Sequence, residues 1–101
     1  MAKQDRLTAE AANDAIAALD GWVREDEKWM AGSYRFASFT EAIGFVGRIA
    51  DIAEELNHHP FIGIDYKRVT LRLTSWDSGG LTKLDIQSAE RYNEAYRTFV
   101  G

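Results

Sequence analysis

The chain has no cysteine among its 101 residues. A disulfide framework and a thiolate nucleophile are therefore both excluded, although this absence does not identify a cellular compartment. No apolar stretch approaches the length of a membrane span, and the polar segment 1–10 lacks the apolar run of a secretory signal. We therefore expect a cytoplasmic protein that makes no contact with a membrane.

An excess of basic residues is also missing, since 12 Lys and Arg stand against 16 Asp and Glu and the net charge is −4. A protein that binds nucleic acid through its phosphates needs a basic face, so we expect no direct nucleic-acid binding. The sequence has no glycine-rich phosphate loop, because Gly79-Gly80 is too short to be one. A small phosphate site near Lys67, Arg68 and Arg72 stays open.

What the chain does contain is 46% hydrophobic and 12% aromatic residues, which is typical of a folded protein and not of a disordered one. The length suits one domain, residues 1–101, with a core large enough to need no metal or disulfide. No repeat, low-complexity stretch or linker divides the sequence.

Cap residues predict three helix starts, at Thr8, Ser38 and Thr82. The first helix is expected to run to about Leu19. The second opens with a capping box completed by Glu41 and must end by Pro60, because the residue before a proline is pushed out of helical angles. Its apolar stripe is expected to face the core and consists of Ile43, Val46, Ile49, Ala50, Ala53 and Leu56, widened by Phe45 and Ile52.

Four strands are expected, at residues 22–30, 33–37, 61–66 and 68–75. A turn around Ala31-Gly32 joins the first pair, and a short hairpin at Tyr66-Lys67 joins the second. The order is α-β-β-α-β-β-α, which predicts an α+β fold with a four-stranded antiparallel sheet and three helices packed on one face. Because segment 22–29 is highly charged, the first strand should lie at an edge or be broken near Asp26.

The uncovered face of such a sheet must be polar or be buried against another molecule. Copies of the chain joined through sheet edges or helices would provide that cover. We therefore expect a homodimer or a homotetramer.

His58 and His59 are the only histidines, and they stand at the end of the second helical pattern, directly before Pro60. Imidazole can give and take a proton near neutral pH, so the pair is a candidate acid–base site. The structural alternative is that both are cations near the last carbonyls of a helix. Glu54 and Asp51 precede His58 by four and seven residues and should share its side of the helix, where a carboxylate can fix the imidazole tautomer.

Other chemistries are poorly supported. Adjacent histidines on a helix point about 100° apart, and the sequence has no third histidine or cysteine to complete a zinc site, so no metal is expected. No serine lies in a recognisable nucleophile elbow. For Asp51, a place in an exposed charged stripe is the simpler interpretation.

The run Ala53-Glu-Glu-Leu-Asn-His-His-Pro60, followed by Tyr66, Trp76 and Asp85, resembles the pterin-4a-carbinolamine dehydratases. The pattern of that family begins with an acidic residue, three intervening residues and His-His-Pro. An aromatic residue, a His or Trp, and an Asp follow later in the chain. The likeness extends from about residue 5 to the end of the chain. It includes Gly21-Trp22, Phe36, Phe39, residues 42–45, Arg48 and residues 80–82.

The resemblance implies dehydration of a 4a-hydroxytetrahydropterin to a quinonoid dihydropterin in tetrahydropterin recycling, with no cofactor. It implies His58 as the leading general acid or base, and His59 as a residue that binds the pterin and shares proton transfer. Glu54 and Asp85 would support these two. The implied substrate-binding residues are Asn57, Pro60, Thr74, Ser75, Trp76 and Asp77.

Three positions depart from what is common in that family. Trp76 stands where a third histidine is frequent, and an indole can stack on a pterin but cannot shuttle its proton, so unequal rates on the two carbinolamine stereoisomers are expected. Asn57 replaces an aspartate and can still hydrogen-bond a pterin edge. Phe61 replaces a glutamate and either packs in the hairpin, which is the favoured interpretation, or walls the pocket.

A second hypothesis comes from another class of protein. Some relatives with the same fold are dimerisation partners of a homeodomain transcription activator, and others resemble Rubisco assembly factors. The chain could therefore be a non-catalytic binding or assembly protein. The presence of both His58 and His59 favours the enzyme.

Overall fold

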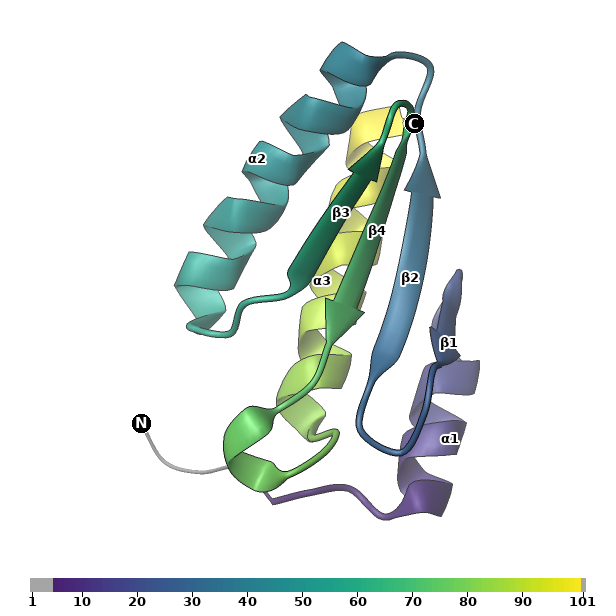
Figure 1. Cartoon of the computed structure of the whole chain (residues 1–101), viewed down its shortest axis with the longest axis vertical. Helices are drawn as coiled ribbons and strands as arrows, with labels where there is room; N and C mark the ends of the chain where they lie inside the picture. Colours follow the sequence, from purple (N-terminus) through teal and green to yellow (C-terminus); the bar gives the residue numbers. More distant parts are fainter. Residues whose placement is uncertain (1–4, 101) are drawn as a thin grey trace.

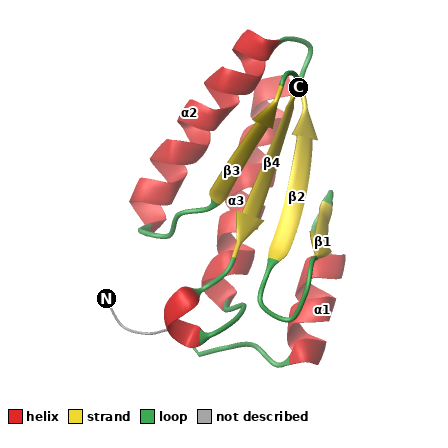
Figure 2. Ribbon diagram, in the orientation of Figure 1, coloured by secondary structure: helices red, strands yellow, loops and turns green. Residues whose placement is uncertain are grey.

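The computed structural model describes residues 5–100, so residues 1–4 of the polar N-terminal segment lie outside the described part. Figures 1 and 2 show three helices and one sheet, in the predicted order α-β-β-α-β-β-α, with a short 3-10 helix before the last helix. The elements are α1 (Ala9–Ala17), β1 (Trp22–Arg24), β2 (Met30–Arg35), α2 (Phe39–Leu56), β3 (Phe61–Asp65), β4 (Arg68–Leu73), η1 (Trp76–Ser78) and α3 (Lys83–Val100).

The sheet is antiparallel with strand order β1-β2-β4-β3. Its centre is the long pairing of β2 with β4, from Met30 opposite Leu73 to Arg35 opposite Arg68. Alternate residues of these strands are buried, and in Figure 1 α3 passes behind β3 and β4, with α2 beside it and α1 below β1. Helices on one face of an antiparallel sheet explain this alternation and confirm the predicted fold class.

The buried stripe of α2 is shifted from the predicted one. Phe45, Ile49 and Ile52 are fully buried, whereas Ile43 is 42% exposed and Ala50 is also exposed. The prediction was therefore wrong for Ile43 and Ala50. Phe45 and Ile52, which were expected only to widen the stripe, lie at its centre. The reason is that α2 is apolar on two sides, and sequence spacing alone does not say which side meets the sheet.

The first hairpin also differs from its prediction. Met30–Arg35 is one unbroken strand, and the turn lies at residues 25–29, so the turn expected around Ala31-Gly32 is wrong while the break near Asp26 is confirmed. The Asp26 carboxylate accepts from the backbone N–H of Lys28 at 2.8 Å and of Trp29 at 2.9 Å, which is the chemistry of an Asx turn.

Gly32 is needed for packing and not for a turn. It lies inside β2 opposite Trp22, and a Cβ atom at this position would lie 2.4 Å from the buried Trp22 indole. The Ala31-Gly32 pair was interpreted as a turn, whereas here the glycine makes room for an aromatic ring on the neighbouring strand.

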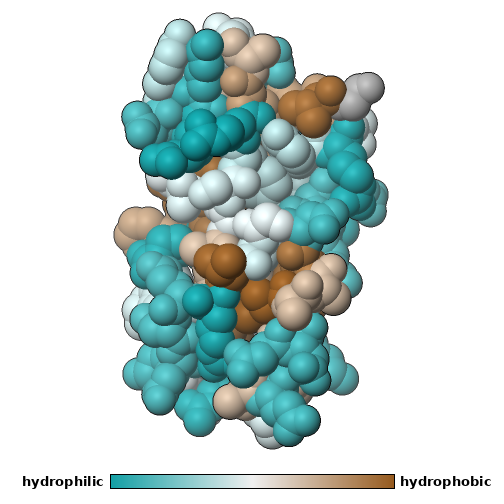
Figure 3. All heavy atoms as spheres, turned by 90° about the vertical axis from the view of Figure 1, so that its right-hand side faces the viewer, coloured by the Kyte–Doolittle hydropathy of each residue, from teal (hydrophilic) through white to brown (hydrophobic). Residues whose placement is uncertain are grey.

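The two edges of the sheet have different surfaces. On the side of β1, the molecular surface is mostly hydrophilic around a small apolar patch (Figure 3). On the other edge, every residue of β3 is exposed, including Phe61 at 64% and Ile64 at 43%.

Within residues 5–100, no helix is long and apolar enough to cross a membrane.

Candidate active site

The two histidines lie just beyond α2, not within it. The helix ends in a left-handed residue, Asn57, with φ 50° and ψ 45°. The N–H of Asn57 donates to the Glu54 carbonyl at 3.2 Å, and the N–H of His58 donates to the Ala53 carbonyl at 3.0 Å. These two bonds form a Schellman motif, and asparagine is one of the few residues with a side chain that tolerates its conformation. The position of Asn57 therefore has a structural reason.

His58 is paired with a buried carboxylate. Its Nε2 lies 2.5 Å from Oδ1 of Asp85, and the two side chains are only 13% and 0% exposed. An ionised carboxylate only accepts hydrogen bonds, so with Asp85 ionised Nε2 carries the hydrogen and Nδ1 takes no part in this contact. The hydrogen bond fixes both the tautomer and the orientation of the ring.

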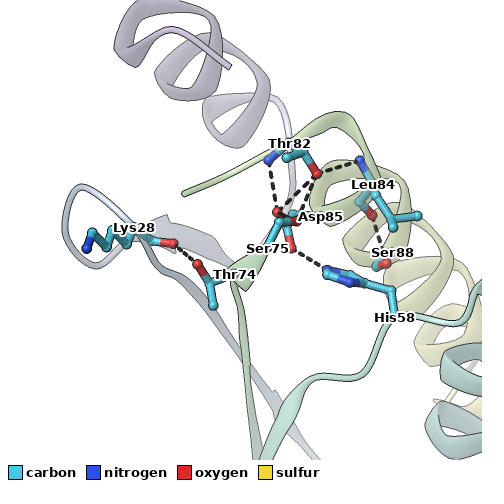
Figure 4. Close-up of polar contacts among 8 residues, drawn as sticks. All are labelled: Lys28, His58, Thr74, Ser75, Thr82, Leu84, Asp85 and Ser88. Carbon is cyan, nitrogen blue, oxygen red and sulfur yellow. Dashed lines mark hydrogen bonds and ion pairs between the residues drawn. The ribbon is translucent and has the colours of Figure 1, made fainter. Parts of the chain in front are cut away.

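Asp85 is itself held in place from the other side (Figure 4). Its Oδ2 accepts from the Ser75 hydroxyl at 2.7 Å and from the Thr82 N–H at 2.9 Å. The Thr82 hydroxyl in turn accepts from the Leu84 N–H at 3.2 Å, which is the reciprocal pattern of a capping box at the start of α3. The same aspartate thus caps a helix and orients a histidine.

His59 has a carboxylate partner of its own, but an exposed one. Its Nε2 contacts Oε2 of Glu54, and the side chains of His59 and Glu54 are 56% and 77% exposed. Glu54 was expected on the same side of the helix as His58, yet it contacts His59, because the left-handed Asn57 redirects the chain before either histidine. Asp51 is exposed on α2, three residues before Glu54.

The segment from Thr74 to Asp77 splits into a buried and an exposed half. Thr74 and Ser75 are each 7% exposed, and their hydroxyls donate to the Lys28 carbonyl and to Asp85. Trp76 is 76% exposed at the start of η1, and Asp77 is exposed beside it. Of this segment, Trp76 and Asp77 have side chains that a ligand can reach.

The sequence did not identify Ser75 and Thr82 as partners of Asp85. Asp85 was expected to support the two histidines, Thr82 to begin the last helix, and Ser75 to bind substrate. It also gave no indication that Trp29 contacts Trp76, at a centroid distance of 5.3 Å. Among residues 5–100, no group of three or more His, Asp or Glu side chains is arranged to hold a metal ion.

A family model described as "Pterin 4 alpha carbinolamine dehydratase" matches residues 5–95. The chain belongs to the pterin-4a-carbinolamine dehydratase family. Its similarity to a protein of Koribacter versatilis named "Putative pterin-4-alpha-carbinolamine dehydratase" is 46% identity over 90 residues, which covers 89% of this chain and 95% of that protein. A Bradyrhizobium protein of the same name is 41% identical over 87 residues, or 85% of this chain and 88% of its own.

Two solved structures are also similar. A crystal structure of a "transcriptional coactivator/pterin dehydratase" from Brucella melitensis has a TM-score of 0.86 and 36% identity, covering 91% of this chain and 99% of the other. A pterin dehydratase-like protein identified as a RuBisCO assembly factor in the alpha-carboxysome has a TM-score of 0.65 and 19% identity, covering 75% and 89%. At that identity, the second likeness shows the shared fold alone.

Proposed function

We propose that this protein dehydrates a 4a-hydroxytetrahydropterin to the quinonoid dihydropterin by histidine general acid/base catalysis, as a step of tetrahydropterin recycling in the cytoplasm. The observation that carries the proposal is the pair of imidazole–carboxylate contacts at the end of α2, one buried and one exposed. Membership of the dehydratase family supports the choice of reaction. The pairing supplies an oriented imidazole next to one that solvent and ligand can reach.

The reaction needs two proton transfers and no change of oxidation state. An acid protonates the 4a hydroxyl, the N5 lone pair forms the C4a=N5 bond as the C4a–O bond breaks, and a base removes the N5 hydrogen. Water is the second product. Proton transfer by positioned groups contributes about 10²–10⁴-fold, which suits the loss of water from a labile carbinolamine without a metal or organic cofactor.

We assign the leading acid–base role to His58, whose Nδ1 is left for proton exchange while Asp85 holds Nε2. His59, which is 56% exposed, is assigned to pterin binding and shared proton transfer. Trp76 is assigned to stacking on the pterin, since its exposed indole offers an aromatic face.

The other substrate-binding assignments are Asn57, Pro60, Thr74, Ser75 and Asp77. For Thr74 and Ser75, whose hydroxyls are engaged within the protein, contact with the pterin would have to come through the backbone.

A stopped-flow assay with a synthetic 4a-carbinolamine tests the proposal. The protein should accelerate dehydration above the spontaneous rate, and His58→Ala and His59→Ala should each lower kcat by at least about tenfold. Asp51→Asn, an exposed change outside the site, serves as the control and should keep the wild-type rate. Near-normal rates in both histidine variants would remove these residues from the mechanism.

The assembly that we propose is a homodimer or homotetramer. β3 pairs only with β4 among the described strands, so its other edge is open, and an open apolar edge favours pairing with another chain. The exposed side of α2 adds Phe39, 50% exposed, and Ile43, 42% exposed. Sedimentation at two protein concentrations should report a species of two or four chains.

A second candidate function is protein binding without catalysis. The exposed apolar residues of α2 and β3 favour it, and one related structure is named both a transcriptional coactivator and a pterin dehydratase. The two candidates differ in a single measurement. Accelerated dehydration would favour the enzyme, and pterin binding without accelerated dehydration would favour the non-catalytic candidate.

A further inference from the structure

Three aromatic rings lie together where the β1–β2 turn meets the two segments that carry the candidate site. Trp29 ends the turn, Phe61 follows Pro60, and Trp76 begins η1. The Trp29 ring is edge-to-face with Trp76, at 5.3 Å and 83°, and with Phe61, at 6.4 Å and 74°. Trp76 is 76% exposed and Phe61 is 64% exposed, so a planar ligand can reach both.

Trp29 is held by an arginine that is itself paired. The Arg72 guanidinium lies 4.5 Å from the centroid of the Trp29 ring, and Arg72 Nε donates to the Glu25 carboxylate at 2.7 Å. Glu25 and Trp29 close the same turn, because the Glu25 N–H donates to the Trp29 carbonyl at 2.9 Å. Moving the Trp29 ring away from Trp76 would therefore break its contact with the Arg72 guanidinium.

The turn is also fastened to the strand that leads into the site. The Thr74 hydroxyl donates to the Lys28 carbonyl, and Figure 4 shows Thr74 turned toward Lys28 and away from the group of Ser75, Asp85 and His58. Two consecutive residues thus stabilise two different parts of the site. Ser75 fixes Asp85, and Thr74 fixes the turn that presents Trp29.

We propose that Trp29 is a positioning residue for the pterin, acting through Trp76. An exposed indole samples several rotamers, and their loss on binding weakens affinity. The contact with Trp29 restricts the Trp76 side chain before the ligand binds, so that the face of the indole is already oriented to stack on the bicyclic pterin ring. This inference rests on the proposed dehydratase function and adds a residue outside the His-His-Pro pattern to it.

Binding and turnover of Trp29→Ala test the inference. The Kd for 7,8-dihydrobiopterin, measured by calorimetry, and the KM for the carbinolamine should both rise about 2- to 12-fold, the range that one edge-to-face contact supports. The kcat should stay unchanged, because His58 and His59 are untouched. Trp29→Phe, which keeps an aromatic edge, should restore most of the affinity.

Two further variants separate positioning from general damage. Val23→Ala, a change at a 63% exposed residue of β1 on the same hairpin, is the matched control and should behave as wild type. In a Trp76→Ala background, Trp29→Ala should have no additional effect, since the residue through which it acts is gone. If Trp29→Ala does not fold, Arg72→Met, which removes the cation beside the ring, should raise Kd in the same direction.

The outcomes distinguish the two proposals. If the wild-type protein binds and dehydrates pterins but Trp29→Ala matches Val23→Ala, or keeps its full effect in the Trp76→Ala background, the role of Trp29 is overturned and the dehydratase function stands. If the wild type neither binds the dihydropterin nor accelerates dehydration, the proposed function is wrong, and the role of Trp29 is wrong with it.

Discussion

Replacing Asp85 by asparagine should reverse the tautomer of His58. The Asp85 carboxylate contacts His58 Nε2 through Oδ1, and its Oδ2 accepts from the Ser75 hydroxyl, the Thr82 N–H and, at 3.4 Å, the Thr82 hydroxyl. Asparagine has one acceptor oxygen, and the fixed backbone N–H of Thr82 requires it. The amide NH₂ then faces His58 Nε2, which must become an acceptor and move its hydrogen to Nδ1.

A hydrogen bond to a charged group is worth about 1.5–3 kcal/mol, which corresponds to a loss of about 10- to 150-fold in kcat. The KM should change less, because Asp85 is 0% exposed and its side chain is out of reach of a ligand. Stopped-flow kinetics measure the loss, and ¹⁵N NMR of the imidazole nitrogens reports which one carries the hydrogen.

Glu54→Gln provides the comparison with the exposed pair. Because Glu54 is 77% exposed, its contact with His59 should contribute less than about 1 kcal/mol, and kcat should fall by no more than about fivefold. The reasoning is refuted if folded Asp85→Asn keeps kcat within threefold of wild type. It is equally refuted if the two variants lose the same activity.

Three other predictions concern stereochemistry and stability. Wild type should favour one of the resolved 4a(R) and 4a(S) carbinolamines, and Trp76→His should narrow the ratio of their rates; equal rates in wild type would contradict this. Ser38→Ala removes the hydroxyl that accepts from the Glu41 N–H at 3.1 Å, which should cost about 1 kcal/mol of stability. A thermal melt should therefore show a Tm lower by about 4–8 °C. An unchanged Tm would show that the cap contributes nothing to stability. Burial raises the pKa values of Tyr34 and Tyr92 above their ordinary 10, so the unfolded chain loses these protons at lower pH than the folded chain. The free energy of unfolding, measured with urea, should be steady up to pH 10 and then fall by as much as about 1.4 kcal/mol per pH unit for each tyrosine. A free energy that stays constant to pH 11 would contradict the assignment.

The fold was predictable because its boundaries are marked by local chemistry. Ser38 caps α2 as its spacing with Glu41 indicated, and the alternation of Val69, Leu71 and Leu73 identified a strand with one buried face. The first hairpin was harder, since Gly32 is compatible with a turn and with a crowded strand position. Only the partner strand, which brings the Trp22 ring against it, decides between them.

For the candidate site, the sequence singled out residues but did not indicate the contacts between them. His58, His59 and Asp85 belong to a recognisable pattern, whereas the pairing of His58 with Asp85 and of His59 with Glu54 depends on the left-handed turn at Asn57. Asparagine tolerates that conformation without requiring it. The sequence therefore could not show that the chain would change direction there, or which carboxylate each imidazole would meet.

The contact between His58 and Asp85 joins positions 27 residues apart, and the second supporting group, Ser75, comes from a third segment. A chain still emerging from the ribosome has no Asp85 to offer until the start of α3 has been made. Onset of the proposed dehydratase activity would therefore coincide with completion of the fold, so the rate of that reaction would report refolding of this small domain.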